Sequence, residues 1–297
     1  MLVSLTAARS VDGAVGAFLS IRCLRSLVTS GEWSGDRAAV FERDDDTCRR
    51  CGTTADEDPA GLCLYPVGGV PLDGDVHESG LVTVCTSCFG SLHVEPISGT
   101  VLEPAPLFDL VRKTTEREGV TVSAVAAFAS LTTGLPEAVD ADASGLPAES
   151  EAAAEYRQAR REVLLAIDSV DAGLEQLHAV DADALEPTVG DALAGFTGTA
   201  TKLQSELRGI VALGESIVVG LERCQGCFEP VPGGDRDRCS TCGLETRDID
   251  DWCRPADDTV AFESLYEAIN ETLQTASGTT EALTDRTTIV AERLHDA

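Results

Sequence analysis

Apolar residues recur at three-, four- and seven-residue steps through the C-terminal half of the chain. They do so over residues 156–177, and again over 196–221 after a break at 186–190. A third run covers residues 262–294. This spacing places apolar side chains on one face of a helix, and three such faces in one chain can cover one another. We therefore predict long heptad helices in an antiparallel coiled coil or bundle over residues 147–297, and a mainly α fold.

The first 40 residues predict one further helix. Residues 13–29 carry a shorter apolar stripe at three- and four-residue steps. Cys23 lies on this stripe, where we expect its thiol to pack as a small core residue rather than to bind metal. Residues 37–43 can form a short helix that leads into the first cysteine pair.

Residues 100–146 are predicted to form short helices followed by a linker. Helices are expected at 107–118 and 122–131, interrupted at Gly119 because glycine is a weak helix former. Residues 140–149, DADASGLPAE, have the composition of a linker.

Charge adds a constraint on the surroundings of the protein. The chain has 51 acidic and 22 basic residues and a formal net charge of −29. The acids are spread along the whole chain, two of the basic residues are lysines, and 43% of residues are hydrophobic. This composition resembles that of halophilic cytoplasmic proteins more than a disordered acidic tail. At molar salt the Debye length is about 3 Å, so the charge argues neither for nor against DNA binding.

We expect a soluble cytoplasmic protein with no membrane partner. The apolar run 14–28 contains Arg22 and Arg25, and the uncharged run 119–136 is interrupted by Ser, Thr and Gly134. The second run suits a buried helix better than a membrane span. No secretory leader pattern precedes the cysteines, which fall into pairs that are typical of metal sites.

The cysteines supply the clearest chemistry. Eight of the eleven form four Cys-x-x-Cys pairs, and a set of four thiolates favours tetrahedral coordination of Zn²⁺. We predict two structural zinc sites, formed by Cys48, Cys51, Cys85 and Cys88 and by Cys224, Cys227, Cys239 and Cys242.

The second set lies in the sequence CQGCFEPVPGGDRDRCSTCG and resembles a zinc ribbon over residues 222–245. Gly226 and Gly243 suit tight turns around the cysteines. The ribbon lies in the connection between two predicted heptad helices. It can therefore staple a helical hairpin, or it can offer a docking surface for protein or nucleic acid. Cys253 is a spare thiol nearby, because four better-spaced ligands already saturate a tetrahedral ion.

The first set lies in a module over residues 41–99, with strands predicted at 62–67 and 81–84. Its sequences FERDDDTCRRCG and GLVTVCTSCFGSLH resemble the zinc-stapled, four-cysteine form of the HNH endonuclease family. The resemblance implies a zinc-bound ββα fold in which a catalytic divalent ion lies beside the structural zinc.

The catalytic positions of that family are replaced in this chain. The resemblance implies an Asp/His-His pair at the end of the first strand, an Asn before Leu-Val-x-x-Cys and a His after the last cysteine. These groups bind the catalytic ion and activate water. Here the positions hold Tyr65 and Pro66, Gly80 and Phe89, none of which replaces an imidazole or an amide. We therefore predict no catalytic residues and no catalytic divalent ion.

Three functions are compatible with these patterns. The leading one is a catalytically degenerate, HNH-like zinc protein that acts as a scaffold for nucleic acid or protein, with association through the heptad helices. The second is an active, metal-dependent DNA endonuclease of the HNH type with shifted ligands, for which His77 and His93 are the candidates. The third is a purely structural coiled-coil interaction protein.

Overall fold

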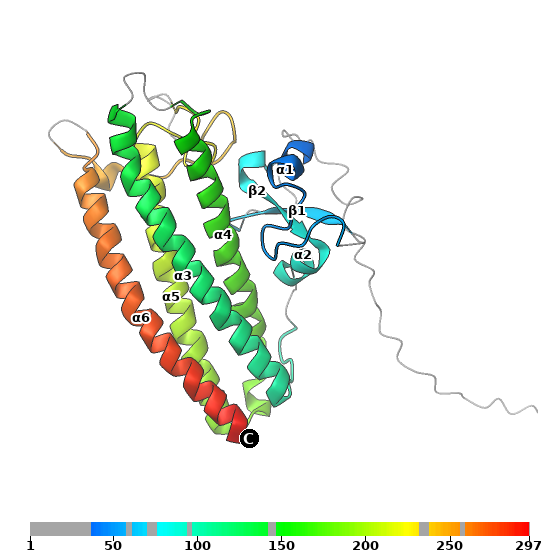
Figure 1. Cartoon of the computed structure of the whole chain (residues 1–297). Coiled ribbons are helices and arrows are strands. Elements are labelled where there is room, and N and C mark those ends of the chain that lie inside the picture. The colour runs from blue at the N-terminus through cyan, green and yellow to red at the C-terminus, as the bar shows by residue number, and fades with distance from the viewer. Residues whose placement is uncertain are drawn as a thin grey trace, which may run out of the picture.

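The computed structural model describes residues 37–57, 61–69, 76–93, 97–141, 147–231, 238–255 and 259–296. In this part of the chain, four long helices form a bundle, and a small module with a two-stranded sheet lies against one side of it (Figure 1). The fold is therefore mainly helical, as predicted. The helix predicted at 13–29, with Cys23, lies outside the described residues.

The chain runs up and down the bundle, so that each long helix is antiparallel to the next (Figure 1). The four helices are α3 (Pro104–Ala141), α4 (Glu151–His178), α5 (Pro187–Gly220) and α6 (Phe262–Asp296). α3 and α5 each pack against the other three helices, whereas α4 and α6 occupy opposite corners. The connection between α5 and α6 carries the second cysteine set.

Local signals define where α4 and α5 begin. The side chain of Ser150 accepts a hydrogen bond from the N–H of Ala153 and so caps α4. Glu186 caps α5 through the N–H of Thr188, and Pro187 occupies the first turn, where its missing N–H costs nothing. The break between the first two heptad runs therefore precedes α5, slightly earlier than the pattern predicts.

The structure corrects the prediction for α3. Two helices interrupted at Gly119 were expected, but one helix of 38 residues passes through this position. A glycine in a helix interior costs about 1 kcal/mol. Val111, Val125 and Phe128, on either side of it, are 0–2% exposed, and their burial outweighs that cost. α6 likewise continues through Gly278 without a break.

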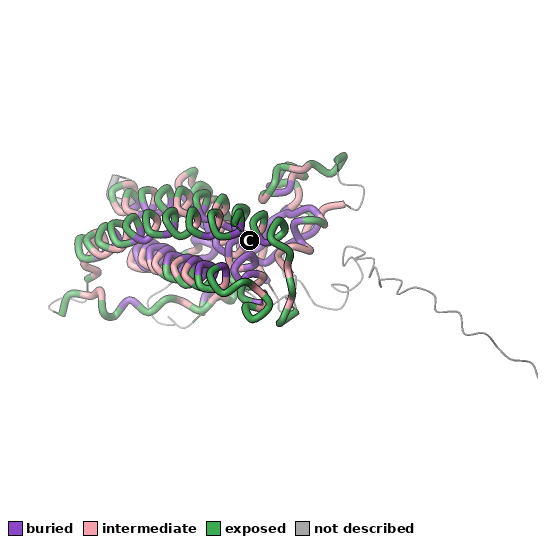
Figure 2. The backbone as a smooth tube through the Cα atoms, turned by 90° about the horizontal axis from the view of Figure 1, so that it is seen from below, coloured by how far each residue is buried: buried purple, intermediate pink, exposed green. Residues whose placement is uncertain are grey.

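The apolar stripes form the core of the bundle. Figure 2, a view from below, shows buried positions turned toward the inside of the bundle and exposed positions on its outer faces. The buried side chains come from all four helices and include Leu107, Phe128, Tyr156, Val163, Phe196, Leu203, Ile210, Leu265 and Ile269. The heptad stripes are thus used within the chain, in an antiparallel bundle, while the supercoiling of a coiled coil stays a prediction.

One stretch of α3 is long and apolar enough to cross a membrane by length and composition, with a mean hydropathy of 1.3. The core helices of soluble proteins have the same property. In this fold Leu107, Phe128 and Leu135 of α3 are at most 1% exposed and lie in the bundle core.

The module beside the bundle is built from α1 (Arg37–Arg43), β1 (Leu62–Pro66), β2 (Leu81–Cys85) and α2 (Thr86–Leu92). Its strands pair antiparallel, with Leu64 opposite Thr83, which confirms the predicted strands. The apolar cluster inside it includes Val82, Val84 and Phe89, and Leu165 of α4 completes this cluster. The module therefore shares its core with the bundle.

Gly214 brings α5 so close to α3 that a methyl group does not fit between them. A Cβ atom at this position would lie 2.8 Å from Cε1 of Phe128 and 2.9 Å from Oγ1 of Thr132. We expect Gly214→Ala to lower the free energy of unfolding by about 1–3 kcal/mol, because overpacking outweighs the better helix propensity of alanine. Urea titration in molar KCl measures the change.

Gly209 of the same helix is the control, because a Cβ there meets nothing within 4 Å. Gly209→Ala should raise the free energy of unfolding by up to about 1 kcal/mol. Equal effects of the two substitutions would contradict the close approach of α3 and α5.

Candidate metal centres

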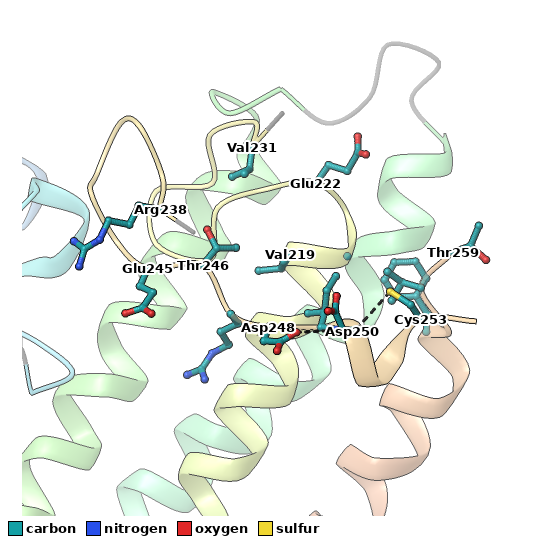
Figure 3. A pocket seen from close by; sticks show the side chains of 15 residues that line it. Val219, Glu222, Val231, Arg238, Glu245, Thr246, Asp248, Asp250, Cys253 and Thr259 are labelled. Carbon is teal, nitrogen blue, oxygen red and sulfur yellow. Dashed lines mark hydrogen bonds between the residues drawn. The ribbon is translucent and has the colours of Figure 1, made fainter. Parts of the chain in front are cut away.

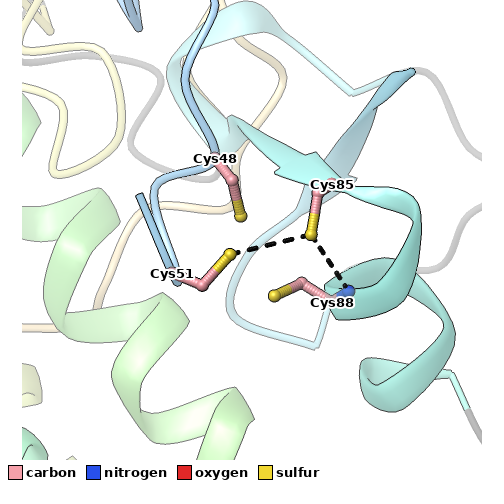
Figure 4. A group of neighbouring side chains, drawn as sticks. All are labelled: Cys48, Cys51, Cys85 and Cys88. Carbon is pink, nitrogen blue, oxygen red and sulfur yellow. Dashed lines mark hydrogen bonds between the residues drawn. The ribbon is translucent and has the colours of Figure 1, made fainter. Parts of the chain in front are cut away.

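The four cysteines of the first set converge between the loop after α1 and the start of α2 (Figure 4). Cys48 and Cys51 come from a tight knuckle turn. In it the N–H of Cys48 donates to the carbonyl of Thr53 and the N–H of Gly52 donates to the carbonyl of Cys48, both at 2.8 Å. Gly52 has a φ of 78°, a left-handed conformation that glycine adopts without strain. The turn thereby directs both sulfur atoms to one side.

Cys85 and Cys88 come from the junction of a strand and a helix. Cys85 ends β2 and caps α2, and its sulfur accepts a hydrogen bond from the N–H of Cys88 at 3.4 Å. The sulfurs of Cys51 and Cys85 are 3.7 Å apart. All four sulfur atoms of the set lie within 4.8 Å of one another.

The second set is built from two knuckle turns of the same kind. In each, the N–H of the first cysteine donates to the carbonyl five residues later at 2.9 Å. The sulfurs of Cys224 and Cys242 are 3.5 Å apart, and those of Cys227 and Cys239 are 3.6 Å apart. All four lie within 4.8 Å of one another, so the structure gathers the eight cysteines into the two sets expected from the sequence.

The glycines of the second set have different roles. Gly243 has a φ of 70° and occupies the left-handed position of its turn, as expected. In the other turn that position is held by Phe228, with a φ of 67°, and Gly226 instead provides space, because a Cβ there would lie 2.9 Å from Cδ2 of Leu244. The backbone strain at Phe228 is offset by burial: its ring is 0% exposed and packs against Tyr156.

The donor sets fit a divalent metal ion. Four thiolates make a closed tetrahedral site, which leaves no position for water or substrate and so serves structure rather than catalysis. The thiols of the first set already influence one another. A hydrogen bond between their side chains holds the pKa of Cys48 below its ordinary value and that of Cys88 above it. Metal binding must displace the protons that remain on the set.

Two arginines lie beside the first set. Arg50 donates to the carbonyl of Cys88 at 3.4 Å and to Oγ of Ser169 in α4 at 3.0 Å. Arg117 of α3 donates to the carbonyl of Ser169 at 3.4 Å, and burial, together with the neighbouring charge of Arg50, lowers its pKa. Two adjacent cations need a nearby negative charge. A divalent ion bound by four thiolates leaves two net negative charges, so these arginines match a metal-loaded set.

Carboxylates of α4 hold the first module, which is the module with the two-stranded sheet that carries the first cysteine set. Oδ2 of Asp168 accepts a hydrogen bond from the N–H of Gly68 at 2.9 Å and from the hydroxyl of Tyr65 at 3.4 Å. Glu162 forms an ion pair with Arg49 of the knuckle turn. Burial raises the pKa of Asp168 to about 6, because the interface partly shields its carboxylate from water.

The segment that carries the second cysteine set, which we call the second module, is held by α4 and α5 together. The hydroxyl of Tyr156 donates to the carbonyl of Gln225 at 2.8 Å. Glu215 of α5 is 2% exposed and accepts from Nε of Arg160 at 2.7 Å and from Arg247 after the second set. The apolar pattern of the sequence did not reveal these contacts. The two consecutive arginines within the first heptad run were nevertheless a signal that α4 carries buried charge.

The structure also places the residues at which the sequence resemblance led us to look for catalytic groups. Phe89 stacks on His93 with ring centroids 4.3 Å apart, and Tyr65 meets the edge of His93 at 5.2 Å. Gly80 lies in the short turn before β2, where His77 accepts a hydrogen bond from the N–H of Ser79 at 3.2 Å. Among the described residues, the potential metal ligands form no group beyond the two cysteine sets.

A pocket of about 830 Å³ lies where α5 leads through the second module into α6 (Figure 3). Its polar lining has both signs of charge, from Arg238 and Arg247 and from acids that include Glu222 and Asp250. Cys253 lies in its wall and donates its thiol to the carbonyl of Ile249 at 3.5 Å. Cys253 therefore stays outside the second set, as expected.

Comparison with known proteins gives no relative: no family model matches the chain, and neither the curated proteins nor the solved structures contain a match.

We expect Cys48→Ser and Cys224→Ser each to remove one of two metal ions per chain and to unfold the local module, because binding and folding are coupled in such sites. Elemental analysis after treatment with a competing chelator measures the loss. Cys253→Ser, outside both sets, is the matched control and should keep both ions. A metal content that does not change in the first two variants would contradict the assignment.

We expect Asp168→Asn to stabilise the protein above pH 6. The raised pKa of Asp168 means that the protonated form favours folding, and this contribution is lost as pH rises from about 4 to about 6. Asparagine keeps an acceptor for Tyr65 and Gly68 without the buried charge. The gain over wild type should grow from near zero at pH 4 to about 1–3 kcal/mol at pH 8.

Urea titration at several pH values measures this gain. Asp285→Asn removes an exposed carboxylate from α6 and is the control, with an expected effect within about 0.5 kcal/mol. A gain for Asp168→Asn that is the same at pH 4 and pH 8 would show that the carboxylate is not desolvated by the module.

Proposed function

We propose that this chain is a zinc-binding scaffold protein whose HNH-like module lacks nuclease chemistry and serves as a contact surface. The packing of Tyr65, Phe89 and His93 carries the proposal, because aromatic contacts fill the positions where the family would bind a catalytic ion. Burial, and then the charge of Asp168, raise the pKa of Tyr65 far above its ordinary value. The phenol is therefore no general base near neutrality.

The proposed metal ions are two zinc ions with structural roles. Zn²⁺ is the usual ion for four thiolates, and both sets are closed. The acidic composition fits a cytoplasm rich in salt, and thiols that bind zinc fit a reducing compartment. The protein is accordingly proposed to work in the cytoplasm of a halophilic cell.

The contact surface is proposed to lie between the two modules. A cleft of about 650 Å³ is lined there by His77 and Gly68 of the first module and by groups of the second. The heptad stripes are buried inside the bundle and offer little for association. The charged lining has both signs, from Arg160, Arg238, Arg247, Glu215, Glu245 and Asp248. Mixed charges favour a protein partner over the uniformly negative backbone of DNA.

Metal counting and a nuclease assay on the same sample test this proposal. Protein purified in molar KCl should contain two zinc ions per chain and should leave duplex and single-stranded DNA intact with Mg²⁺, Mn²⁺ or Ni²⁺. Both results follow if the only metal sites are closed thiolate sets.

Cleavage of DNA would overturn the proposal if it required a third, EDTA-labile ion and was abolished by His93→Ala. His178→Ala, at the exposed end of α4, is the matched control for a surface histidine. Cleavage that survives both substitutions would point to a contaminating nuclease, and repurification would decide the outcome.

A further inference from the structure

A further, smaller cavity, of about 150 Å³, lies between the first module and α4. Three arginines line it: Arg43 from the end of α1, Arg49 from the knuckle turn and Arg161 from α4. Val82 and Leu165 provide apolar walls. The cavity belongs to neither cysteine set and does not coincide with the cleft between the modules.

Two of these arginines have partners. Arg43 donates from Nε to Asp44 at 2.9 Å, from Nη1 to the carbonyl of Glu78 at 3.0 Å and from Nη2 to the carbonyl of Leu81 at 2.7 Å. It is therefore fixed in place. Arg49 is held by Glu162 through Nη2 alone, which leaves its other guanidinium nitrogens without a hydrogen bond among the described residues.

Arg161 is different, because its residue is largely buried and its guanidinium is unpaired. The residue is 8% exposed, and its guanidinium forms neither a hydrogen bond nor an ion pair with any described residue. The guanidinium nitrogens keep some contact with solvent. Burial, followed by the charge of Arg43, lowers its pKa to about 9, so it remains a cation near neutrality. A buried guanidinium with five donors normally has a partner of opposite charge.

The carboxylates near Arg161 accept hydrogen bonds from other donors or face solvent. Both oxygens of Asp44 accept from Arg43, and Oδ2 also accepts from the N–H of Thr83 at 2.8 Å. Oε1 of Glu162 accepts from Arg49 and from Gln158. Asp45, the third acid in the lining, is exposed to solvent. The charge of Arg161 is therefore only partly compensated by the protein.

We propose that this cavity binds one small oxyanion of the phosphate type, held by Arg161 together with Arg49. A planar guanidinium presents parallel N–H donors that match two oxygens of phosphate or sulfate. The cavity is too small for much beyond one such ion. The bound oxyanion supplies the charge that Arg161 lacks, and it bridges α4 to the knuckle turn.

Thermal unfolding of the full, metal-loaded chain tests the site with inorganic phosphate as the probe. At constant ionic strength in KCl, replacing part of the salt with potassium phosphate should raise the Tm until the site saturates, because the ion binds only the folded state. Phosphate also stabilises proteins without binding, through exclusion from the surface, but that effect does not saturate.

Arg161→Met should abolish the saturable part of the rise. Arg112→Met, which removes an exposed arginine from α3, is the matched control and should keep it. Isothermal titration of the wild-type chain with phosphate needs no variant and should give one site per chain. The proposal is overturned if this titration shows no saturable binding, or if Arg161→Met retains it.

A last comparison distinguishes the sources of the phosphate group. A short single-stranded oligodeoxynucleotide should reproduce the rise in Tm, dependent on Arg161, if the site takes a phosphate of nucleic acid. If only inorganic phosphate does so, the ligand is the free ion. Saturable binding of chloride with the same affinity would overturn the assignment to an oxyanion. None of these outcomes depends on whether the protein cleaves DNA.

Discussion

Mutual repulsion of the clustered thiolates is the constraint on which the rest of the structure depends. Each set places four sulfur atoms within 4.8 Å of one another, and such a group is stable as thiolates only around a cation. Packing against the bundle helps each module to resist this repulsion. The first module completes its core with Leu165 of the bundle, and the second buries Phe228 against Tyr156. Each module is therefore stabilised both by metal binding and by packing against the bundle.

α4 links the two modules because it contacts both of them. Tyr156 contacts the second module directly and Arg160 is linked to it through Glu215 of α5. Glu162, Leu165 and Asp168 contact the first module. Several of these contacts involve buried charge, which adds little net stability compared with apolar packing. Removing one partner, however, leaves the other charge buried and alone. Any other docking of the modules would separate these charged partners and would therefore be less stable.

Sequence patterns predicted the features that depend on near neighbours along the chain. The spacing of Cys48 and Cys51 defines a knuckle turn, and short apolar runs around Leu64 and Thr83 define two strands, because both signals are local. Prediction was wrong at Gly119, where a local preference of about 1 kcal/mol competed with burial of Phe128 against other helices. It also could not assign Arg160 to Glu215, because their meeting depends on how two helices are rotated relative to each other.

The second metal set does more than close the connection between α5 and α6. That connection is about 40 residues long, and cross-linking its middle shortens the effective loop only about two-fold, which is worth about 0.6 kcal/mol of chain entropy. The larger contribution is that the set covers one end of the bundle, where Phe228 and Tyr156 are 0% exposed. Loss of metal would leave the helices largely associated but uncover aromatic surface at that end. Metal supply would thus control where a protease first gains access to the chain.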